Sequence, residues 1–187
     1  SDGYIITNAH VLQNDEQEYV QNDNGYGYDP YDFFGGFFGD LEAGRIDAEG
    51  FRQELSRLAG REMTYEECGY ACMGFIESVP PRNLEAIRRL RQQGYRLVLL
   101  SNTNPYVMKW AMSPAFDGKG HGLRDYFDEC YLSYECKMMK PAPEFFRLLI
   151  KREKLDAGEI LFVESSVSGG KGVMTRADHK SGTDRIE

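Results

Sequence analysis

Apolar positions from residue 81 onward alternate between helical spacing and short unbroken runs. Pro81 precedes Leu84, Ile87 and Leu90, which recur every three residues as on one face of a helix, and proline is favoured in a helix's first turn. The run at 96–100 is continuously apolar after its first residue, which is typical of a strand buried on both faces. The pattern therefore predicts a helix followed by a core strand.

The same alternation continues towards the C-terminus. Pro105 and Pro143 open further helical segments, the second lasting through about Lys154, and apolar runs at 130–133 and 160–163 predict two more strands. Strands separated by helices form parallel sheets with both faces covered. We therefore expect an α/β, Rossmann-like fold, with any site at the carboxyl ends of the strands.

A purely helical pattern precedes this region. Asp47 can cap a helix whose apolar face carries Phe51, Leu55 and Leu58, and residues 64–67 form a capping box that opens a second helix. These helices predict a small cap beside the sheet.

Changes in composition and in the spacing of apolar residues divide the chain into four parts. We expect a start and loop at 1–32, a helical cap at 33–80, an α/β core at 81–164 and a flexible tail at 165–187. The tail has a glycine-rich stretch around Lys171, but it lacks the Gly-Lys-Ser/Thr ending and the apolar helix of a nucleotide-binding loop.

Composition limits the partners of this chain. Its 187 residues are 41% hydrophobic, which is enough for a packed core, and a formal net charge of -8 disfavours nucleic acid, whose phosphates need a basic face. No apolar run approaches the roughly 20 residues of a membrane span. A small phosphorylated metabolite is compatible with this negative charge if lysine or Mg²⁺ makes its binding pocket locally positive.

The compartment is predicted from the cysteines and from the start of the chain. The polar opening at 1–3 differs from a basic, then apolar, secretion leader. Four cysteines have no histidine close in sequence that could complete a zinc site: Cys68, Cys72, Cys130 and Cys136. We expect them to be buried and reduced in a cytoplasmic protein.

Small polar side chains follow the most apolar run of the chain. Ser101 ends that strand, and its hydroxyl, with the backbone N–H groups of Asn102 and Thr103, could donate hydrogen bonds to a phosphoryl group. Alternatively, Ser101 ends the strand or caps the next helix, a role that suits Asn104 better. The strand-end position favours substrate binding by Ser101 and Asn102.

Two charged residues could complete such a site. Lys140 precedes Pro141 and Pro143, which restrict the backbone and so fix the direction of a cation suited to phosphate. Glu164 directly follows the run at 160–163, where its carboxylate could hold Mg²⁺. Each could instead be an ordinary surface charge, but their order after Ser101 favours a shared site at the sheet edge.

Taken together, four segments resemble a known family. Residues 101–104, the strand at 131–135, residues 140–144 and residues 161–164 are similar in order and spacing to the motifs of haloacid dehalogenase-like hydrolases. The likeness spans about 33–164 and is greatest to sugar-phosphate phosphatases with a small helical cap.

The resemblance implies a Rossmann-like core, a Mg²⁺ ion and hydrolysis through an aspartyl-phosphate. In that scheme one Asp attacks phosphorus and a second, two positions on, protonates the leaving oxygen. Ser101 would hold the phosphoryl group, Lys140 would pair with nucleophile and phosphate, and Glu164 would help to hold the metal.

The nucleophile is where the chain departs from this family. No Asp-x-Asp follows an apolar strand upstream of Ser101, and Glu164-Ser165 stands where the family has Asp-Asp. Asp29 and Asp32 lie upstream, but they are three positions apart and follow no strand. We therefore expect the chain to be weak or inactive as a phosphatase.

The missing segment is replaced by one with a different likeness. Residues 2–11 resemble the catalytic-histidine strand of HtrA-type serine proteases, with His10 matching the base, although the protease's aspartate and serine motifs do not appear. We therefore expect a chimeric sequence. Residues 4–7 are β-like. We expect that they insert between the strands at 96–100 and 160–163, placing Asn8 near where the nucleophile would have been, or else that the fold is only marginally stable.

Three functions follow from these observations. The first is a phosphatase of a small phosphorylated metabolite, with a sugar phosphate favoured. The second is a non-catalytic phosphate-binding or interaction domain in which Ser101 and Lys140 still bind anions. The third is a protease fragment, which rests on residues 2–11 alone.

Overall fold

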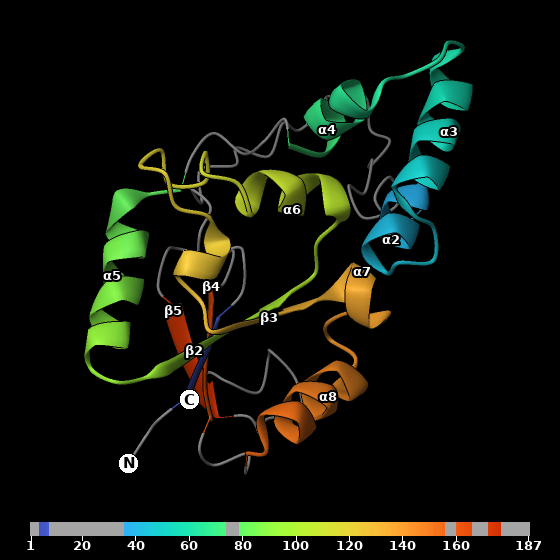
Figure 1. Cartoon of the computed structure of the whole chain (residues 1–187). Coiled ribbons are helices and arrows are strands. Elements are labelled where there is room, and N and C mark those ends of the chain that lie inside the picture. The colour runs from blue at the N-terminus through green and yellow to red at the C-terminus, as the bar shows by residue number, and fades with distance from the viewer. Residues whose placement is uncertain (1–3, 8–35, 74–78, 156–159, 166–171, 177–187) are drawn as a thin grey trace, which may run out of the picture.

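A five-stranded sheet forms the centre of the molecule (Figure 1). The computed structural model describes residues 4–7, 36–73, 79–155, 160–165 and 172–176. Within these residues the strand order is β3-β2-β1-β4-β5. The strands are β1 (Tyr4–Thr7), β2 (Arg96–Ser101), β3 (Glu129–Leu132), β4 (Ile160–Ser165) and β5 (Gly172–Arg176).

β1 lies at the centre of this sheet. It pairs in parallel with β2 on one side and with β4 on the other, over its whole length from Tyr4 to Thr7. This confirms the prediction that residues 4–7 insert between the two strands. Four residues considered in the sequence lie outside the described part of the chain: Asn8, His10, Asp29 and Asp32.

The other edge of the sheet departs from the expectation. β4 continues through Glu164 to Ser165 and pairs antiparallel with β5, which spans Gly172–Arg176. The prediction of a flexible tail at 165–187 is therefore wrong for β5. An edge strand has one neighbour and needs no long apolar run, so its sequence gives a weak signal.

Helices cover both faces of the sheet and one end of it. They are α2 (Phe37–Glu42), α3 (Ala48–Ala59), α4 (Tyr65–Met73), α5 (Pro81–Gln92), α6 (Pro105–Ala111), the 3₁₀ turn η2 (Leu123–Asp125), α7 (Ser133–Cys136) and α8 (Pro143–Glu153). The predicted helices after Pro81, Pro105 and Pro143 are confirmed. Within the described residues, no helix is long and apolar enough to cross a bilayer.

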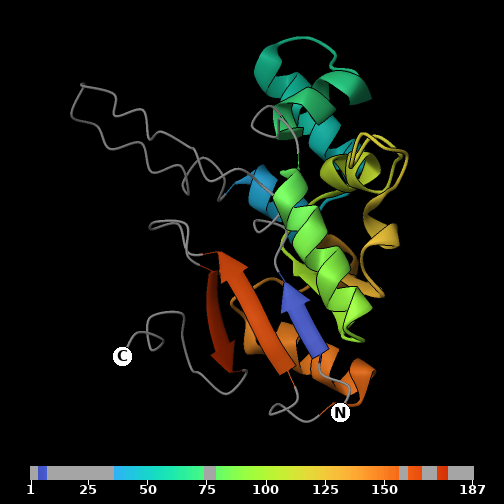
Figure 2. The same cartoon turned by 90° about the vertical axis from the view of Figure 1, so that its left-hand side faces the viewer.

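The two faces of β2 enter different hydrophobic clusters. Leu97 and Leu99 pack with residues of α5 and α6, whereas Val98 and Leu100 pack with residues of α8. Figure 2 shows α5 in front of the sheet and α8 behind it, with α2, α3 and α4 at the end to which β1 points. The chain therefore has the expected three-layer α/β fold, and its parallel strands end below the helical cap.

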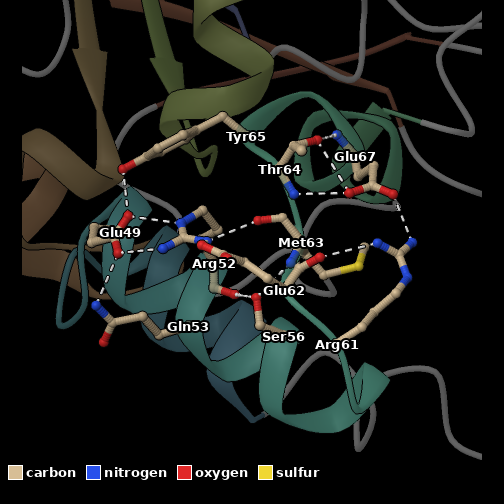
Figure 3. A network of polar contacts seen from close by, with 10 residues as sticks. All are labelled: Glu49, Arg52, Gln53, Ser56, Arg61, Glu62, Met63, Thr64, Tyr65 and Glu67. Atoms are coloured by element: carbon tan, nitrogen blue, oxygen red, sulfur yellow. Dashed lines mark hydrogen bonds and ion pairs between the residues drawn. The ribbon is translucent and has the colours of Figure 1, made fainter.

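Polar contacts join the helices of this cap (Figure 3). Arg52 of α3 donates to Glu49 at 2.8 Å and to the carbonyl of Met63, just before α4, at 2.9 Å. Hydrogen bonds from Arg52 and then Tyr65 hold the pKa of the Glu49 carboxyl well below its usual range, even though burial opposes this. The carboxylate is therefore charged at neutral pH, as the network requires.

The sequence signals for the cap helices are largely confirmed. Asp47 accepts from the N–H of Gly50 at 2.8 Å, and Glu67 accepts from the N–H of Thr64 at 2.8 Å, as the predicted caps require. Leu58 is a correction, because 58% of it is exposed although it shares the helical spacing of buried Phe51. The face of α3 that packs against the rest of the protein is therefore narrower than the helical spacing of its apolar residues suggested.

The cysteines are free thiols, and three of the four are buried. Cys68 and Cys72 lie in α4, within the hydrophobic cluster of the cap, and Cys130 lies in β3. Cys136 is half-buried. Burial raises the pKa of the Cys72 thiol to about 12, which keeps it protonated and unreactive.

The cap packs directly against the core. Its cluster of Phe38, Leu41 and Phe51 includes Tyr106 of α6, whose hydroxyl donates to the carbonyl of Ala48 at 2.8 Å. The turn after α2 lies against α7: a Cβ added to Gly44 would come 2.2 Å from the carbonyl oxygen of Tyr134.

Replacing Gly44 with alanine should therefore destabilise the protein more than the same change at Gly60. Both glycines have left-handed backbones, with φ of 64° and 66°, but a Cβ at Gly60 has no atom within 4 Å. Left-handed strain alone costs roughly 1–2 kcal/mol, and overpacking at Gly44 adds about 1–3 kcal/mol. Urea unfolding measures both losses. Equal losses would show that the turn separates from α7 at no cost.

Candidate phosphate-binding site

Ser101 ends β2 and is completely buried. Its hydroxyl donates to the carbonyl of Asn102 at 3.3 Å, which is near the long limit for such a bond. A hydroxyl hydrogen can rotate, so this weak bond leaves Ser101 able to donate to a stronger acceptor.

Ser101 is not the cap of the following helix. Asn104 fills that role, because its side-chain oxygen accepts from the N–H groups of Tyr106 and Val107, both at 3.1 Å. Of the two purely structural roles considered for Ser101, ending the strand and capping the next helix, only the first remains.

Asn102 connects the end of β2 to the segment before α8. Its side-chain nitrogen donates to the carbonyl of Lys140 at 2.9 Å, and its side-chain oxygen accepts from the N–H of Lys140 at 2.8 Å. Lys140 is thereby held next to the strand that ends in Ser101. Ser101 and Lys140, which are 39 positions apart in sequence, thus belong to adjoining segments.

Lys140 also approaches β4. Its ammonium nitrogen lies 6.0 Å from the centre of the Phe162 ring, within the range of a cation–π contact. Phe162 is two positions before Glu164 in the same strand. The Lys140–Pro141 peptide bond is cis. The Lys140 side chain therefore extends from the segment beside Asn102 to the middle of β4.

Glu164 was expected just after its strand but lies within β4. Its backbone pairs with Val173 of β5, so the strand continues past the apolar run at 160–163. A common pocket for Ser101, Lys140 and Glu164 stays a prediction. Among the residues that the structure describes, no group of three or more His, Cys, Asp or Glu side chains could hold a metal ion.

Ser133 is a residue that the sequence analysis assigned to a strand and did not consider for the site. β3 ends at Leu132, which pairs with Ser101, and Ser133 begins α7, so the expected strands at 130–133 and 131–135 both run past the end of β3. Ser133 is completely buried, and its hydroxyl oxygen accepts from the N–H of Thr103 at 2.9 Å. That N–H was expected to bind phosphate, but in the structure it joins the start of α7 to the loop after β2.

The same hydroxyl reaches the cap. Ser133 donates to the carbonyl of Glu42, the last residue of α2, at 2.6 Å. Burial raises the pKa of the Glu42 carboxyl. The loop after β2 is thus tied through one hydroxyl to the cap helix above it. The sequence does contain a signal that could have identified Ser133: like Ser101, it is a small hydroxyl residue directly after an apolar run.

Comparison with known proteins gives a family for most of the chain. The model of the haloacid dehalogenase-like hydrolases matches residues 8–172. A D-ribitol-5-phosphate phosphatase from Bacteroides thetaiotaomicron is 47% identical over 133 residues, which are 71% of this chain and 64% of that enzyme. The chain therefore spans slightly less than two thirds of this curated relative.

Two solved structures are similar over most of their length. A predicted HAD-like family hydrolase from Porphyromonas gingivalis is 36% identical with a TM-score of 0.72, covering 86% of this chain and 80% of that one. A HAD family enzyme from Bacteroides thetaiotaomicron, crystallised as an aspartate-to-alanine mutant with magnesium and inorganic phosphate, is 30% identical with a TM-score of 0.71, covering 87% and 84%.

Proposed function

The chain belongs to the haloacid dehalogenase-like hydrolases, and on this premise we propose that it binds a phosphorylated small metabolite, preferably a polyol or sugar phosphate, at the carboxyl ends of β2 and β4. The observation that carries the proposal is the pair of hydrogen bonds between Asn102 and Lys140, which holds a lysine beside the strand that ends in Ser101. The similarity to a D-ribitol-5-phosphate phosphatase supports the substrate class.

In this site Ser101 donates its hydroxyl hydrogen to a phosphoryl oxygen and Lys140 supplies a positive charge. The cation offsets phosphate charge that the acidic chain would otherwise repel. Both groups lie on segments fixed by the fold, so binding requires little reorganisation.

Mg²⁺ is proposed as the cofactor, with Glu164 as one protein ligand. Carboxylate oxygen suits this ion, which usually takes one or two carboxylates, several waters and substrate phosphate. A related enzyme crystallised with magnesium and phosphate supports this assignment. When bound, the ion would neutralise charge on the phosphoryl group.

Hydrolysis is proposed to be slow or absent in this chain. The residues that follow β1 are Asn8, Ala9 and His10, where the family scheme has an Asp-x-Asp. A carboxamide cannot attack phosphorus as a carboxylate does, so the aspartyl-phosphate route lacks its nucleophile. This sequence feature favours the second candidate function, a phosphate-binding domain without turnover.

The protease hypothesis has no support beyond residues 2–11. Residues 4–7 of that segment pair with β2 and β4 as the central strand of the sheet. The chimeric origin of the segment stays a prediction, as does the division of residues 1–164 into a start, a cap and a core. Buried free thiols fit the proposed cytoplasmic location.

Titration calorimetry with inorganic phosphate and D-ribitol 5-phosphate, in the presence of Mg²⁺, tests the binding site. Lys140→Ala should weaken phosphate binding about 10- to 100-fold, since it removes a charge-assisted contact, and Ser101→Ala about 5- to 10-fold. Lys151→Ala, which removes an exposed lysine of α8, is the matched control and should change little. A wild-type chain that binds neither compound would refute the proposal, as would equal losses for the two lysines.

A further inference from the structure

We propose that Asn102 is a positioning residue that sets Lys140 in the phosphate site, not a residue that binds phosphate itself. The inference rests on the proposed function and revises the role that the sequence suggested for Asn102. It is carried by what the Asn102 side chain does in the structure.

The amide of Asn102 matches the backbone of Lys140 on both sides. One hydrogen bond of 2.9 Å runs from the side-chain nitrogen to the Lys140 carbonyl, and another of 2.8 Å returns from the Lys140 N–H to the side-chain oxygen. A carboxylate lacks the donor and a hydroxyl cannot span both groups, so an amide of this length is the suitable side chain.

The segment around Lys140 forms a hydrogen-bonded turn of its own. The N–H of Ala142 donates to the carbonyl of Met139 at 2.9 Å, which makes a tight turn just before α8. That turn fixes the shape of the segment but not its distance from β2. The two bonds from Asn102 fix that distance, because they join the turn to the residue after the strand.

Placement of the backbone decides where the ammonium can reach. Lysine is a point charge on a flexible stem, and each rotatable bond adds freedom that binding must restrict. With its backbone held by Asn102, Lys140 extends towards β4, where its ammonium lies 6.0 Å from the Phe162 ring centre. Loss of this clamp, the two hydrogen bonds from Asn102, would let the turn move, and the ammonium would lose its fixed position.

A double-mutant cycle separates positioning from direct contact. Asn102→Ala, Lys140→Ala and the double variant are titrated with inorganic phosphate. If Asn102 acts through Lys140, each single change weakens binding about 10-fold or more, and the double variant is no weaker than Lys140→Ala. If Asn102 contacts phosphate, the two losses multiply, and the inference is wrong.

Hydrogen exchange of the Lys140 amide gives a second readout that does not depend on phosphate. Exchange should be much faster in Asn102→Ala than in the wild type and unchanged in Lys140→Ala, which keeps the backbone bonds. Unchanged exchange in Asn102→Ala would overturn the clamp. Asn102→Ser replaces it if the alanine variant does not fold, with the same expectation. A wild type that does not bind phosphate would instead refute the proposed function. Hydrogen exchange of the Lys140 amide would still test whether Asn102 holds that backbone.

Discussion

Replacing Asn8 and His10 with aspartates is expected to give the chain Mg²⁺-dependent phosphatase activity roughly 10³-fold or more above that of the wild type. The change creates Asp-Ala-Asp directly after β1, which pairs with both β2 and β4. The remaining elements of the proposed site, Ser101 and Lys140, are already in adjoining segments. Groups that act as a unit give large, non-additive effects, so the gain should appear mainly in the double variant.

Release of inorganic phosphate from D-ribitol 5-phosphate measures this gain. The single variants Asn8→Asp and His10→Asp should remain well below the double variant, since one supplies the nucleophile and the other the acid. Adding Lys140→Ala to the double variant should remove most of the activity. A folded, phosphate-binding double variant without turnover would show that the nucleophile's place is not directly after β1.

The wild type provides the complementary test. Its turnover should be far below that of an intact phosphatase, because no strand-end carboxylate pair is available at residues 8–10. Robust Mg²⁺-dependent hydrolysis that is abolished by Asp29→Asn or Asp32→Asn would mean that these distant aspartates supply the missing carboxylates.

Features written in local sequence could be predicted well. The run at 96–100 lies within β2 and is buried from Leu97 onward, and prolines at 81, 105 and 143 each begin a helix. Such signals depend on the spacing and conformational preferences of a few neighbouring residues. The insertion of residues 4–7 was also predictable, because the fold that the other motifs resemble required a central strand.

Features that depend on distant contacts could not be predicted. Asn102 was assigned to substrate binding through its backbone N–H, because nothing in the sequence shows that its side chain faces Lys140. Ser133 was assigned to a strand for the same reason, since its partners are Thr103 and Glu42 from other elements. β5 was missed because it is recognised by its pairing with β4 and not by its composition.

Deleting residues 1–12 is expected to abolish cooperative folding. β1 is hydrogen-bonded on both sides, so its loss leaves the facing edges of β2 and β4 without partners at the centre of the sheet. A buried backbone group without a partner costs about 1–3 kcal/mol. Several such groups together rival the total stability of a small domain, about 5–15 kcal/mol. Urea unfolding followed by circular dichroism should therefore show a broad transition or none.

Truncation after Lys171 is the matched control for this deletion. It removes β5, which pairs with β4 alone at the edge of the sheet, so the newly unpaired edge can be solvated. This variant should keep a cooperative transition with a lower midpoint. If instead the deletion of 1–12 leaves both the midpoint and the m-value unchanged, then β1 is not part of the stable sheet, because insertion adds buried surface and must alter both quantities.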